Sequence, residues 1–262
     1  MRGIYSSYRH LVIGAGKMGK KHGEMLTAFG DSVIYVDLEF RSDGDGVAGF
    51  DSILVCTPPN THADIIRGIA PAGIPIFVEK PVISLGSSLD GVVFPRTTMV
   101  GCNWRYCECC DPTGEIVCVY PTTKEAAAQD LIHFYDWSVQ RKGPPDLARF
   151  IQGEGGNRLV LMHGKSVFSA SILYDGALAP QSWWAGVVGK AQLHPYGPCP
   201  MFHSQMIHWR ECVAEGWQTD NPIELALKRT NELMRVVERP VTSVEIEREA
   251  PMPTRLKERH LL

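Results

Sequence analysis

The first hundred residues alternate short apolar runs with segments of helical periodicity. Between the runs, apolar positions recur every three or four residues, as on the buried face of a helix. Helices are predicted over Lys17–Phe29 and His62–Ala70. Strands that alternate with helices indicate an α/β domain with a doubly wound parallel sheet. The predicted strands are His10–Ile13, Ser32–Asp37, Asp51–Cys56, Ile74–Val78 and Thr97–Cys102.

Beyond Trp104 the pattern changes to one helix, a group of strand-like runs and two further helices. This order favours an α+β domain with a mostly antiparallel, open sheet. The expected domains are residues 1–102 and 103–262, and Glu245–Leu262 is expected to be a surface strand and a frayed end. The predicted helices are Lys124–Val139, Phe202–Glu215 and Pro222–Glu238, and the strand-like runs are Leu159–Met162, Ser166–Tyr174 and Trp183–Val188.

Composition narrows the classes of protein that the chain could represent. Its 262 residues suffice for two modest domains, and 44% hydrophobic with 21% charged residues is typical of a globular protein. The net charge of −3 gives no general attraction to nucleic acid or anionic membranes, so neither is expected as a partner. No apolar run spans a bilayer, and the start lacks a signal peptide pattern. Because several of the eight cysteines lie inside strand-like runs, a reducing compartment is favoured, and the expected location is the cytoplasm.

A glycine motif follows the first predicted strand and opens the first predicted helix. Gly14, Gly16 and Gly19 form a G-x-G-x-x-G, which allows a tight turn, a close approach of a pyrophosphate and close packing of helix on sheet. Asp37 ends the second predicted strand, where a carboxylate binds ribose hydroxyls and repels a 2′-phosphate. Residues 1–102 are therefore predicted to bind NAD. NADP is less favoured, although Arg41 is close enough in sequence to accommodate its extra phosphate.

Several further motifs occur in a familiar order. The glycine segment reads GAGKMGKKH, the third strand continues into DSILVCTPPNTHAD, and the fourth ends in Glu79-Lys80-Pro81. Val100–Tyr106 reads VGCNWRY, and Asp130–Asp136 reads DLIHFYD. Together these motifs resemble the Gfo/Idh/MocA family, which includes glucose–fructose oxidoreductase and inositol dehydrogenase. The resemblance implies an NAD(P)-dependent oxidoreductase acting on the CH–OH group of a sugar, cyclitol or related polyol, which would be its small-molecule substrate.

The chain also departs from the family pattern. The segments between the second and third strands, from Pro81 to Gly101, and from Tyr106 to the next helix are all short. Relatives commonly carry an aspartate four residues before the catalytic histidine, where this chain has Gln129. The catalytic geometry is therefore expected to depart further from the family than the cofactor site does.

The resemblance assigns roles to particular residues. Lys80 would hydrogen-bond the reacting oxygen, and His133 would accept or donate its proton. Either Asp130 or Asp136 could orient the ring of His133, since both lie on its side of the helix. The Lys80–Pro81 bond is expected to be cis. The predicted cofactor residues are Gly14, Gly16, Lys17, Met18, Gly19, Asp37, Thr57, Pro58, Asn60, His62 and Glu79, with Asn60 or Thr61 also a possible helix cap, and the predicted substrate residues are Asn103, Arg105 and Tyr106.

Several alternatives remain open at the level of the sequence. Arg105 fits structural ion pairing as well as substrate binding. Cys107 and Cys110 form a C-x-x-C near Cys102, Cys109 and Cys118, but no second pair completes a zinc site, so no metal is expected. Other activities in the family are NAD-dependent glycoside cleavage and imine or tetrapyrrole reduction, and a non-catalytic NAD-binding subunit is a further possibility.

A homo-oligomer, either a dimer or a tetramer, is expected. An open antiparallel sheet would expose a large apolar face unless another subunit covers it. The candidate residues for this face are Val167, Ile172, Trp183 and Trp184.

Overall fold

A computed structural model describes residues 6–37, 45–84, 86–106, 114–120, 124–153, 156–174, 184–188, 193–194 and 200–238. The chain forms two compact units that interleave along the sequence. Unit 1 comprises Met1–Cys110, Ile132–Trp137 and Gly197–Leu233, and unit 2 comprises Asp111–Leu131, Ser138–Tyr196 and Met234–Leu262. The chain therefore returns to unit 1 twice after residue 110.

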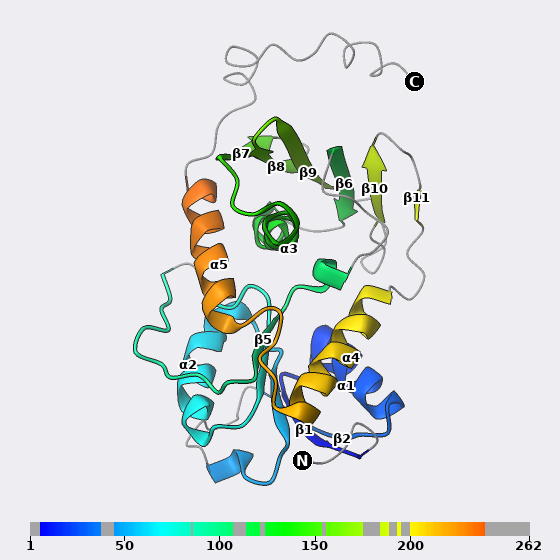
Figure 1. Ribbon diagram of the computed structural model, residues 1–262, viewed down its shortest axis with the longest axis vertical. Helices are drawn as coiled ribbons and strands as arrows, with labels where there is room; N and C mark the ends of the chain where they lie inside the picture. The colour runs from blue at the N-terminus through cyan, green and yellow to red at the C-terminus, as the bar shows by residue number, and fades with distance from the viewer. Residues whose placement is uncertain are drawn as a thin grey trace. The chain divides into compact units, whose positions relative to one another are not determined.

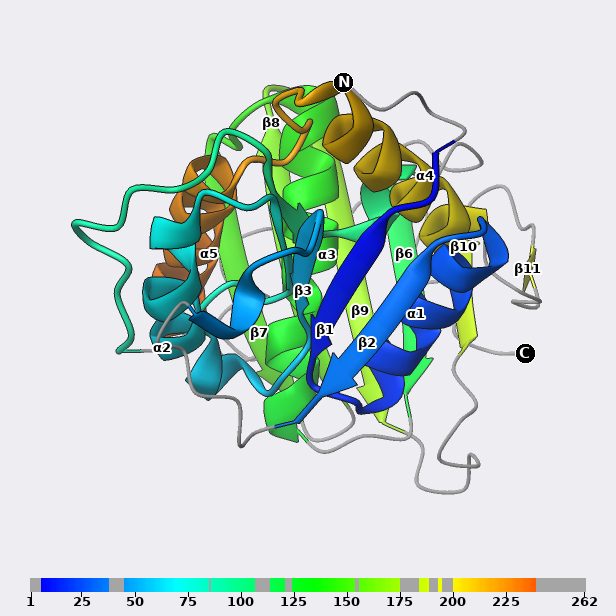
Figure 2. The ribbon, with the colours of Figure 1, turned by 90° about the horizontal axis from the view of Figure 1, so that it is seen from below.

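Unit 1 contains the predicted parallel sheet (Figure 1), and its five strands lie in the order β2-β1-β3-β4-β5. In Figure 2, β1 and β2 run side by side in the same direction. Each expected strand is present within two residues of its predicted start and end. The strands are β1 (Arg9–Ile13), β2 (Ser32–Val36), β3 (Ser52–Val55), β4 (Ile76–Glu79) and β5 (Thr98–Gly101).

Side chains alternate across this sheet, so each face contributes its own hydrophobic core. On one face, Val12, Leu54 and Phe77 pack against α1 (Lys17–Ala28) and α4 (Pro200–Glu215). On the other face, neighbouring residues such as Ile13 and Ile53 pack against α2 (Pro59–Ile69) and the start of α5 (Ile223–Val237). Helices from both ends of the sequence thus cover the sheet.

Helix α2 begins earlier than the prediction places it. Pro59 is its first residue, where the missing N–H removes no helical hydrogen bond and the fixed φ angle suits a helix. Pro58 stands at the N-cap, and no side chain caps the helix, so the expected capping by Asn60 or Thr61 is wrong. The Thr61 hydroxyl is instead hydrogen-bonded to the carbonyl of Pro58 and the hydroxyl of Thr57.

Unit 2 contains a six-stranded sheet in the order β11-β10-β6-β9-β8-β7. All neighbouring strands are antiparallel except β6 and β9, so the prediction of a mostly antiparallel sheet is confirmed. The sequence did not predict β6, β7 or β11. The strands are β6 (Gly114–Tyr120), β7 (Leu147–Gly153), β8 (Gly156–His163), β9 (Ser166–Tyr174), β10 (Trp184–Val188) and β11 (Leu193–His194), and α3 (Lys124–Lys142) is the predicted helix of this region.

The predicted apolar face of this sheet needs correction. Val167 is 51% exposed, but Ile172 is buried within the chain. Five positions separate them on β9, so their side chains point to opposite faces and cannot form one surface. Trp183 and the side chain of Trp184 lie outside the described residues, as do Arg41 and Glu245–Leu262.

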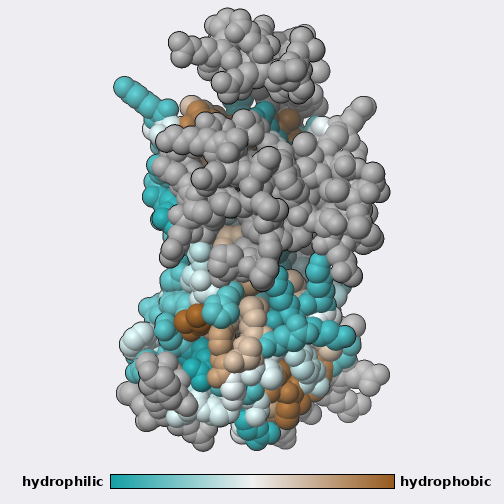
Figure 3. Space-filling view, turned by 90° about the vertical axis from the view of Figure 1, so that its right-hand side faces the viewer, coloured by the Kyte–Doolittle hydropathy of each residue, from teal (hydrophilic) through white to brown (hydrophobic). Residues whose placement is uncertain are grey.

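Seven large hydrophobic side chains are exposed on the described surface. On the coloured part of the face in Figure 3, hydrophobic areas are separated by hydrophilic ones. No helix among the described residues is both long and apolar enough to cross a bilayer. The exposed large hydrophobic residues are Ile34, Tyr35, Val93, Leu147, Val167, Ile207 and Trp217.

Candidate functional site

The glycine turn connects β1 to α1 through three residues with different surroundings. Gly14 has φ of +101°, and a Cβ there would lie 2.7 Å from the backbone of Cys56 and Thr57. A Cβ on Gly19 would lie 2.0 Å from the carbonyl oxygen of Gly14. A Cβ on Gly16 would meet nothing within 4 Å. The turn is therefore closed against the protein at Gly14 and Gly19 and open to the outside at Gly16.

The first turn of α1 is suited to an anion. Gly16 is the N-cap, no side chain caps the helix, and the first turn contains no acidic residue. Lys17 is exposed and Met18 is half-buried at this end. The first backbone N–H groups of a helix have no partner within the helix and carry its positive dipole end. A diphosphate is a group that such an end binds.

Asp37 lies beside this turn. It follows β2 directly and is exposed. The backbone N–H of Gly14 donates to the carbonyl of Val36 at 2.8 Å, which ties the end of β2 to the glycine turn. The residues predicted to bind the diphosphate and those predicted to bind the ribose are therefore neighbours, as in a dinucleotide site.

His62 joins two loops rather than presenting its ring to the surface. Its Nε2 lies 2.7 Å from the carbonyl oxygen of Thr57, and its Nδ1 lies 3.1 Å from that of Pro81. The side chain is fully buried, and burial lowers its pKa. The prediction of direct cofactor contact is therefore corrected: His62 holds together the loops that follow β3 and β4. The neighbouring Pro58 and Asn60 are exposed, and Thr57 is buried.

Glu79 is likewise turned into the protein. Its Oε1 lies 2.5 Å from Nε2 of His22 on α1, and its Oε2 accepts the backbone N–H of Lys80 at 3.2 Å. His22 is fully buried and Glu79 is nearly so. The carboxylate predicted to bind the cofactor therefore ties β4 to α1 and holds the backbone of Lys80. The Lys80–Pro81 bond is cis, as expected.

Lys80 and His133 come close to one another through a short series of contacts. Glu79 pairs with Gly101 across β4 and β5, so Lys80 and Cys102 emerge at the same edge of the sheet. The Cys102 thiol is hydrogen-bonded to Asp136, which lies one turn after His133 on α3. Burial, and then the positive charge of Lys80, lower the pKa of His133 well below its usual value. His133 is therefore neutral at pH 7, and its buried Nδ1 has no partner among the described residues.

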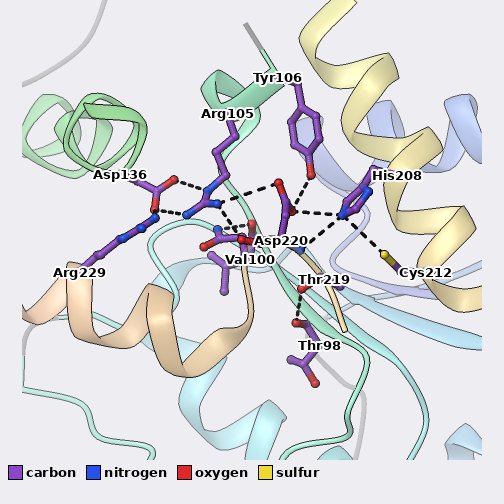
Figure 4. A network of polar contacts seen from close by, with 11 residues as sticks. Thr98, Val100, Arg105, Tyr106, Asp136, His208, Cys212, Thr219, Asp220 and Arg229 are labelled. Atoms are coloured by element: carbon purple, nitrogen blue, oxygen red, sulfur yellow. Dashed lines mark hydrogen bonds and ion pairs between the residues drawn. The ribbon is translucent and has the colours of Figure 1, made fainter. Parts of the chain in front are cut away.

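Asp136 does not orient His133, and this expectation is corrected. Arg105 binds it through Nε at 2.5 Å and Nη2 at 2.9 Å, and Arg229 binds it through Nη1 at 2.5 Å (Figure 4). Asp136 and the Arg105 side chain are almost fully buried. Burial raises the pKa of Asp136 to about 6 while Arg105 opposes the shift, so the carboxyl is ionised at neutral pH. Asp130, the other predicted carboxylate, is half-buried one turn before His133.

The predicted substrate residues Arg105 and Tyr106 are engaged within unit 1. Nη1 of Arg105 donates to the carbonyl of Asp220 at 2.8 Å, and the Tyr106 hydroxyl donates to the Asp220 carboxylate at 2.9 Å. Arg105 thus forms a structural ion pair with Asp136, which is one of the two alternatives that the sequence left open. Asn103 is buried, and its Oδ1 has no partner among the described residues.

The network in Figure 4 also includes residues that were not predicted from the sequence, among them Arg229, Asp220 and His208. Arg229 lies on α5, Asp220 lies in the loop before it, and His208 lies on α4, 3.2 Å from Asp220. Arg229 lies 93 residues after its partner Asp136. Asp220 lies 115 residues after Arg105 and 114 after Tyr106. No local pattern marks a residue whose partner is so distant along the chain.

The described residues include no group of three His, Cys, Asp or Glu side chains arranged to hold a metal ion. Cys107, Cys109, Cys110 and the side chain of Cys118 lie outside those residues, so the zinc alternative is not tested.

Comparison with curated proteins gives matches over part of the chain. Inositol 2-dehydrogenase of Rhizobium meliloti (strain 1021) is 32% identical over 27% of this chain and 27% of its own length. The rhizopine catabolism protein MocA of Rhizobium meliloti is 33% identical over 28% of this chain and 29% of its own length. The matched regions therefore span less than a third of these relatives.

Solved structures show the same fold over most of the chain. UDP-N-acetylglucosamine 3-dehydrogenase GnnA from Acidithiobacillus ferrooxidans aligns with a TM-score of 0.67 at 14% identity, covering 90% of this chain and 98% of its own. A myo-inositol dehydrogenase from Corynebacterium glutamicum aligns with a TM-score of 0.66 at 13% identity, covering 90% and 97%.

One family matches the sequence directly. Residues 35–91 match the Gfo/Idh/MocA family, described as an oxidoreductase family with an NAD-binding Rossmann fold. This stretch includes Asp37, the loop after β3 and Glu79-Lys80-Pro81. This match confirms the resemblance to the Gfo/Idh/MocA family that the motifs indicated.

Proposed function

We propose that this chain is an NAD-dependent oxidoreductase that transfers a hydride between nicotinamide and the CH–OH carbon of a sugar, cyclitol or related polyol. One observation supports it above the others: Lys80 follows β4 at the carboxyl edge of the sheet, and its positive charge acts on the neutral ring of His133. In open parallel α/β sheets, ligands bind beyond that edge. The glycine turn after β1 lies at the same edge.

The residues of unit 1 fit a dinucleotide. The open space at Gly16 would be filled by a Cβ, and its absence leaves room for a diphosphate at the start of α1. Gly14, Lys17, Met18 and Gly19 shape that turn. Asp37 would hold the adenosine ribose and disfavour NADP. Thr57, Pro58 and Asn60 would form the wall along the loop after β3. His62 and Glu79 would hold the loops and strands around this site in place without touching the cofactor.

The two central side chains can manage the proton and the oxygen of an alcohol. When bound, nicotinamide supplies the chemistry of accepting or returning a hydride. In alcohol oxidation, the neutral His133 accepts the hydroxyl proton, and the Lys80 ammonium donates a hydrogen bond to the same oxygen. In ketone reduction the proton moves from His133 to that oxygen. Asp130 is the carboxylate that would orient His133, because both oxygens of Asp136 bind arginine.

The substrate class follows from the relatives. Those matched in sequence and in structure include dehydrogenases of inositol and of an N-acetylglucosamine nucleotide, which carry secondary hydroxyl groups. A ring carbon bearing a hydroxyl is therefore the reacting group we propose. With Arg105 and Tyr106 bound to aspartates, Asn103 is the predicted substrate residue that retains a side-chain oxygen without a described partner.

The proposal is tested by cofactor binding followed by turnover. Calorimetry with NAD and NADP should detect binding, with NAD the tighter ligand. In a panel of cyclitols and sugars, Lys80→Met and His133→Asn should each lower kcat about 100-fold or more while NAD still binds. Lys228→Met, which alters an exposed lysine on α5, is the matched control and should leave kcat unchanged.

Two outcomes would contradict the proposal. Absence of binding by either dinucleotide would remove its basis. Binding without turnover on any member of the panel would instead favour a non-catalytic NAD-binding subunit.

A further inference from the structure

Asp136 is the meeting point of three separate elements of unit 1. Arg105 comes from η3 (Asn103–Tyr106), directly after β5, and Arg229 comes from the middle of α5. Cys102, at the end of β5, adds a thiol hydrogen bond. The carboxylate therefore receives a two-pronged contact from one guanidinium and a single contact from the other, so both of its oxygens are used. We call Arg105, Asp136 and Arg229 the Asp136 clamp.

The clamp buries two positive charges around one negative charge. The side chains of Arg105 and Asp136 are at most 2% exposed, and that of Arg229 is 8% exposed. Removing one member of a buried ion pair leaves the other charge uncompensated, which is far more costly than losing a surface pair. The three side chains are therefore held to one geometry. A bidentate guanidinium contact also fixes the plane of the carboxylate as well as its position.

The clamp is itself fixed to the edge of the sheet. Nη1 of Arg105 donates to the carbonyl of Asp220, and the next residue, Asn221, pairs with Val100 of β5. The Asn221 amide donates to the Val100 carbonyl at 2.8 Å, and the Val100 N–H donates to the Asn221 carbonyl at 3.0 Å. The backbone of Arg105 follows β5, and its guanidinium is held by the segment that pairs with β5. This strand lies next to β4, which ends directly before Lys80.

His133 and Asp136 are three residues apart on α3 and so lie on one side of that helix. Fixing Asp136 therefore fixes the rotation of this turn and its height above the sheet. The Lys80 backbone is held separately, by the carboxylate of Glu79. The relative position of Lys80 and His133 is consequently determined by two anchors, one at Glu79 and one at Asp136.

We propose that the Asp136 clamp is a positioning device that sets where His133 stands against Lys80. This inference deepens the proposed function and rests on it for its catalytic consequence. The clamp residues do not touch the reacting atoms. They act through the helix turn that carries His133, a role different from orienting its ring.

The test measures the electrostatic coupling between Lys80 and His133, which is how strongly the charge of Lys80 shifts the pKa of His133, because this shift depends on the distance between the two side chains. In the otherwise unaltered protein, NMR titration should show that Lys80→Met raises the pKa of His133, by about 1 unit if the charges lie within 4–6 Å. In the Arg229→Met background the same Lys80→Met change should raise it by less than half as much. Arg229→Lys, which keeps a cation, should restore part of the coupling.

Tyr135→Phe is the matched control. It removes a different contact between α3 and α5, the 2.9 Å hydrogen bond from Tyr135 to Glu232, and should leave the coupling unchanged. An undiminished coupling in Arg229→Met would show that the clamp is structural only and would overturn the inference. If Arg229→Met does not fold, Arg229→Lys decides alone; if His133 does not titrate while the protein is folded, crystal structures of the variants measure the Lys80–His133 separation.

Turnover supplies the second readout. Arg229→Met should lower kcat about tenfold or more, leave KM for NAD unchanged, and recover partly as Arg229→Lys. The coupling is measured in the resting protein, so it tests the clamp even if no substrate is turned over. Failure of the proposed function would appear separately, as unchanged turnover in Lys80→Met and His133→Asn.

Discussion

At the scale of single residues, His133 shows how surroundings set chemistry. An imidazole with its ordinary pKa is partly protonated near neutral pH. Burial and the neighbouring Lys80 remove that fraction, which leaves a ring able to accept a proton from an alcohol. His133 became the candidate base from the sequence motif alone. Its protonation state required the structure, because neither its burial nor its distance from Lys80 can be obtained from the spacing of residues.

The lowered pKa predicts the pH dependence of oxidation. In the proposed reaction the neutral form of His133 is the base, so activity should be lost as pH falls through its lowered pKa. We expect the acid limb of kcat/KM to lie below pH 6.5, the ordinary value for histidine. A pH–rate profile for polyol oxidation measures it. An acid limb above pH 6.5 would contradict a lowered pKa for His133.

Asp37 predicts cofactor preference. Replacing it with alanine would remove the proposed charged hydrogen bonds to the ribose and should weaken NAD binding about 10- to 100-fold. NADP binding should weaken less, because repulsion of its 2′-phosphate is removed at the same time. Calorimetry with both dinucleotides measures the change. Asp64→Ala, on an exposed part of α2, is the control, and an equal loss there would show that the effect is not local.

At the scale of elements, the glycine turn separates packing from ligand access. Gly19→Ala places a Cβ 2.0 Å from a backbone oxygen, so it should destabilise the protein by about 1–3 kcal/mol. Gly16→Ala fits a backbone with φ of −73° and open space, so it should lose only the small N-cap preference for glycine and destabilise the protein less than Gly19→Ala does. It should nonetheless weaken NAD about tenfold or more, or 1.4 kcal/mol, since the methyl group blocks the diphosphate.

Chemical denaturation and NAD titration of these two variants provide the measurements. Full NAD affinity in Gly16→Ala would place the diphosphate elsewhere.

The contact between α4 and the loop before α5 predicts a pH dependence of stability. The hydrogen bond with Asp220, and then one with Cys212, raise the pKa of His208 to about 10. Burial alone would raise the pKa of Asp220, but His208 lowers it. A base with a raised pKa stabilises the fold fully below its unfolded value of about 6.5 and loses that contribution as pH rises. The free energy of unfolding should therefore decline between about pH 6.5 and 10.

Urea unfolding across this range tests the assignment to His208. His208→Gln should flatten the decline, whereas His203→Gln, on an exposed part of α4, should preserve it. An equally steep decline in both variants would assign the effect to other groups.

The elements differed in how well the sequence predicted them. The strands of the parallel sheet are short apolar runs between turn signals, and all five were predicted. In unit 2, the bounds of β6 and β7 were not predicted, because β6 begins with Gly114 and Glu115 and β7 contains Arg149 and Gln152, which break up the apolar pattern. The start of α2 was misplaced because Pro58-Pro59 was interpreted as a turn, whereas the second proline opens the helix.

At the scale of the whole molecule, the sequence indicated the candidate cofactor residues. It did not indicate the buried ion pairs that hold the surrounding elements together. Gly14, Gly16, Gly19, Asp37 and Lys80 belong to motifs of a few residues, and the structure places them at one edge of a sheet. The partners of Asp136 could not be predicted, because Arg229 comes from the other end of the chain. Arg105 was therefore given a possible role in substrate binding, whereas its guanidinium binds the carboxylate of Asp136.

We expect the protein to form an oligomer in solution. Light scattering after size-exclusion chromatography should give two or four times the chain mass of 29.0 kDa. Val167→Glu, in the unit 2 sheet, should shift the protein toward monomer, while Val93→Glu, at an 85% exposed residue of unit 1, should not. A monomeric mass for the unaltered protein would contradict this expectation.

The pairing of Val100 with Asn221 has a consequence for synthesis on the ribosome. The two residues are 121 positions apart. At roughly 5–20 residues per second, translation of that interval lasts roughly 6–24 s. Throughout it, the outer edge of β5 on the nascent polypeptide waits for the segment that will cover it, and it is available to chaperones or to neighbouring chains.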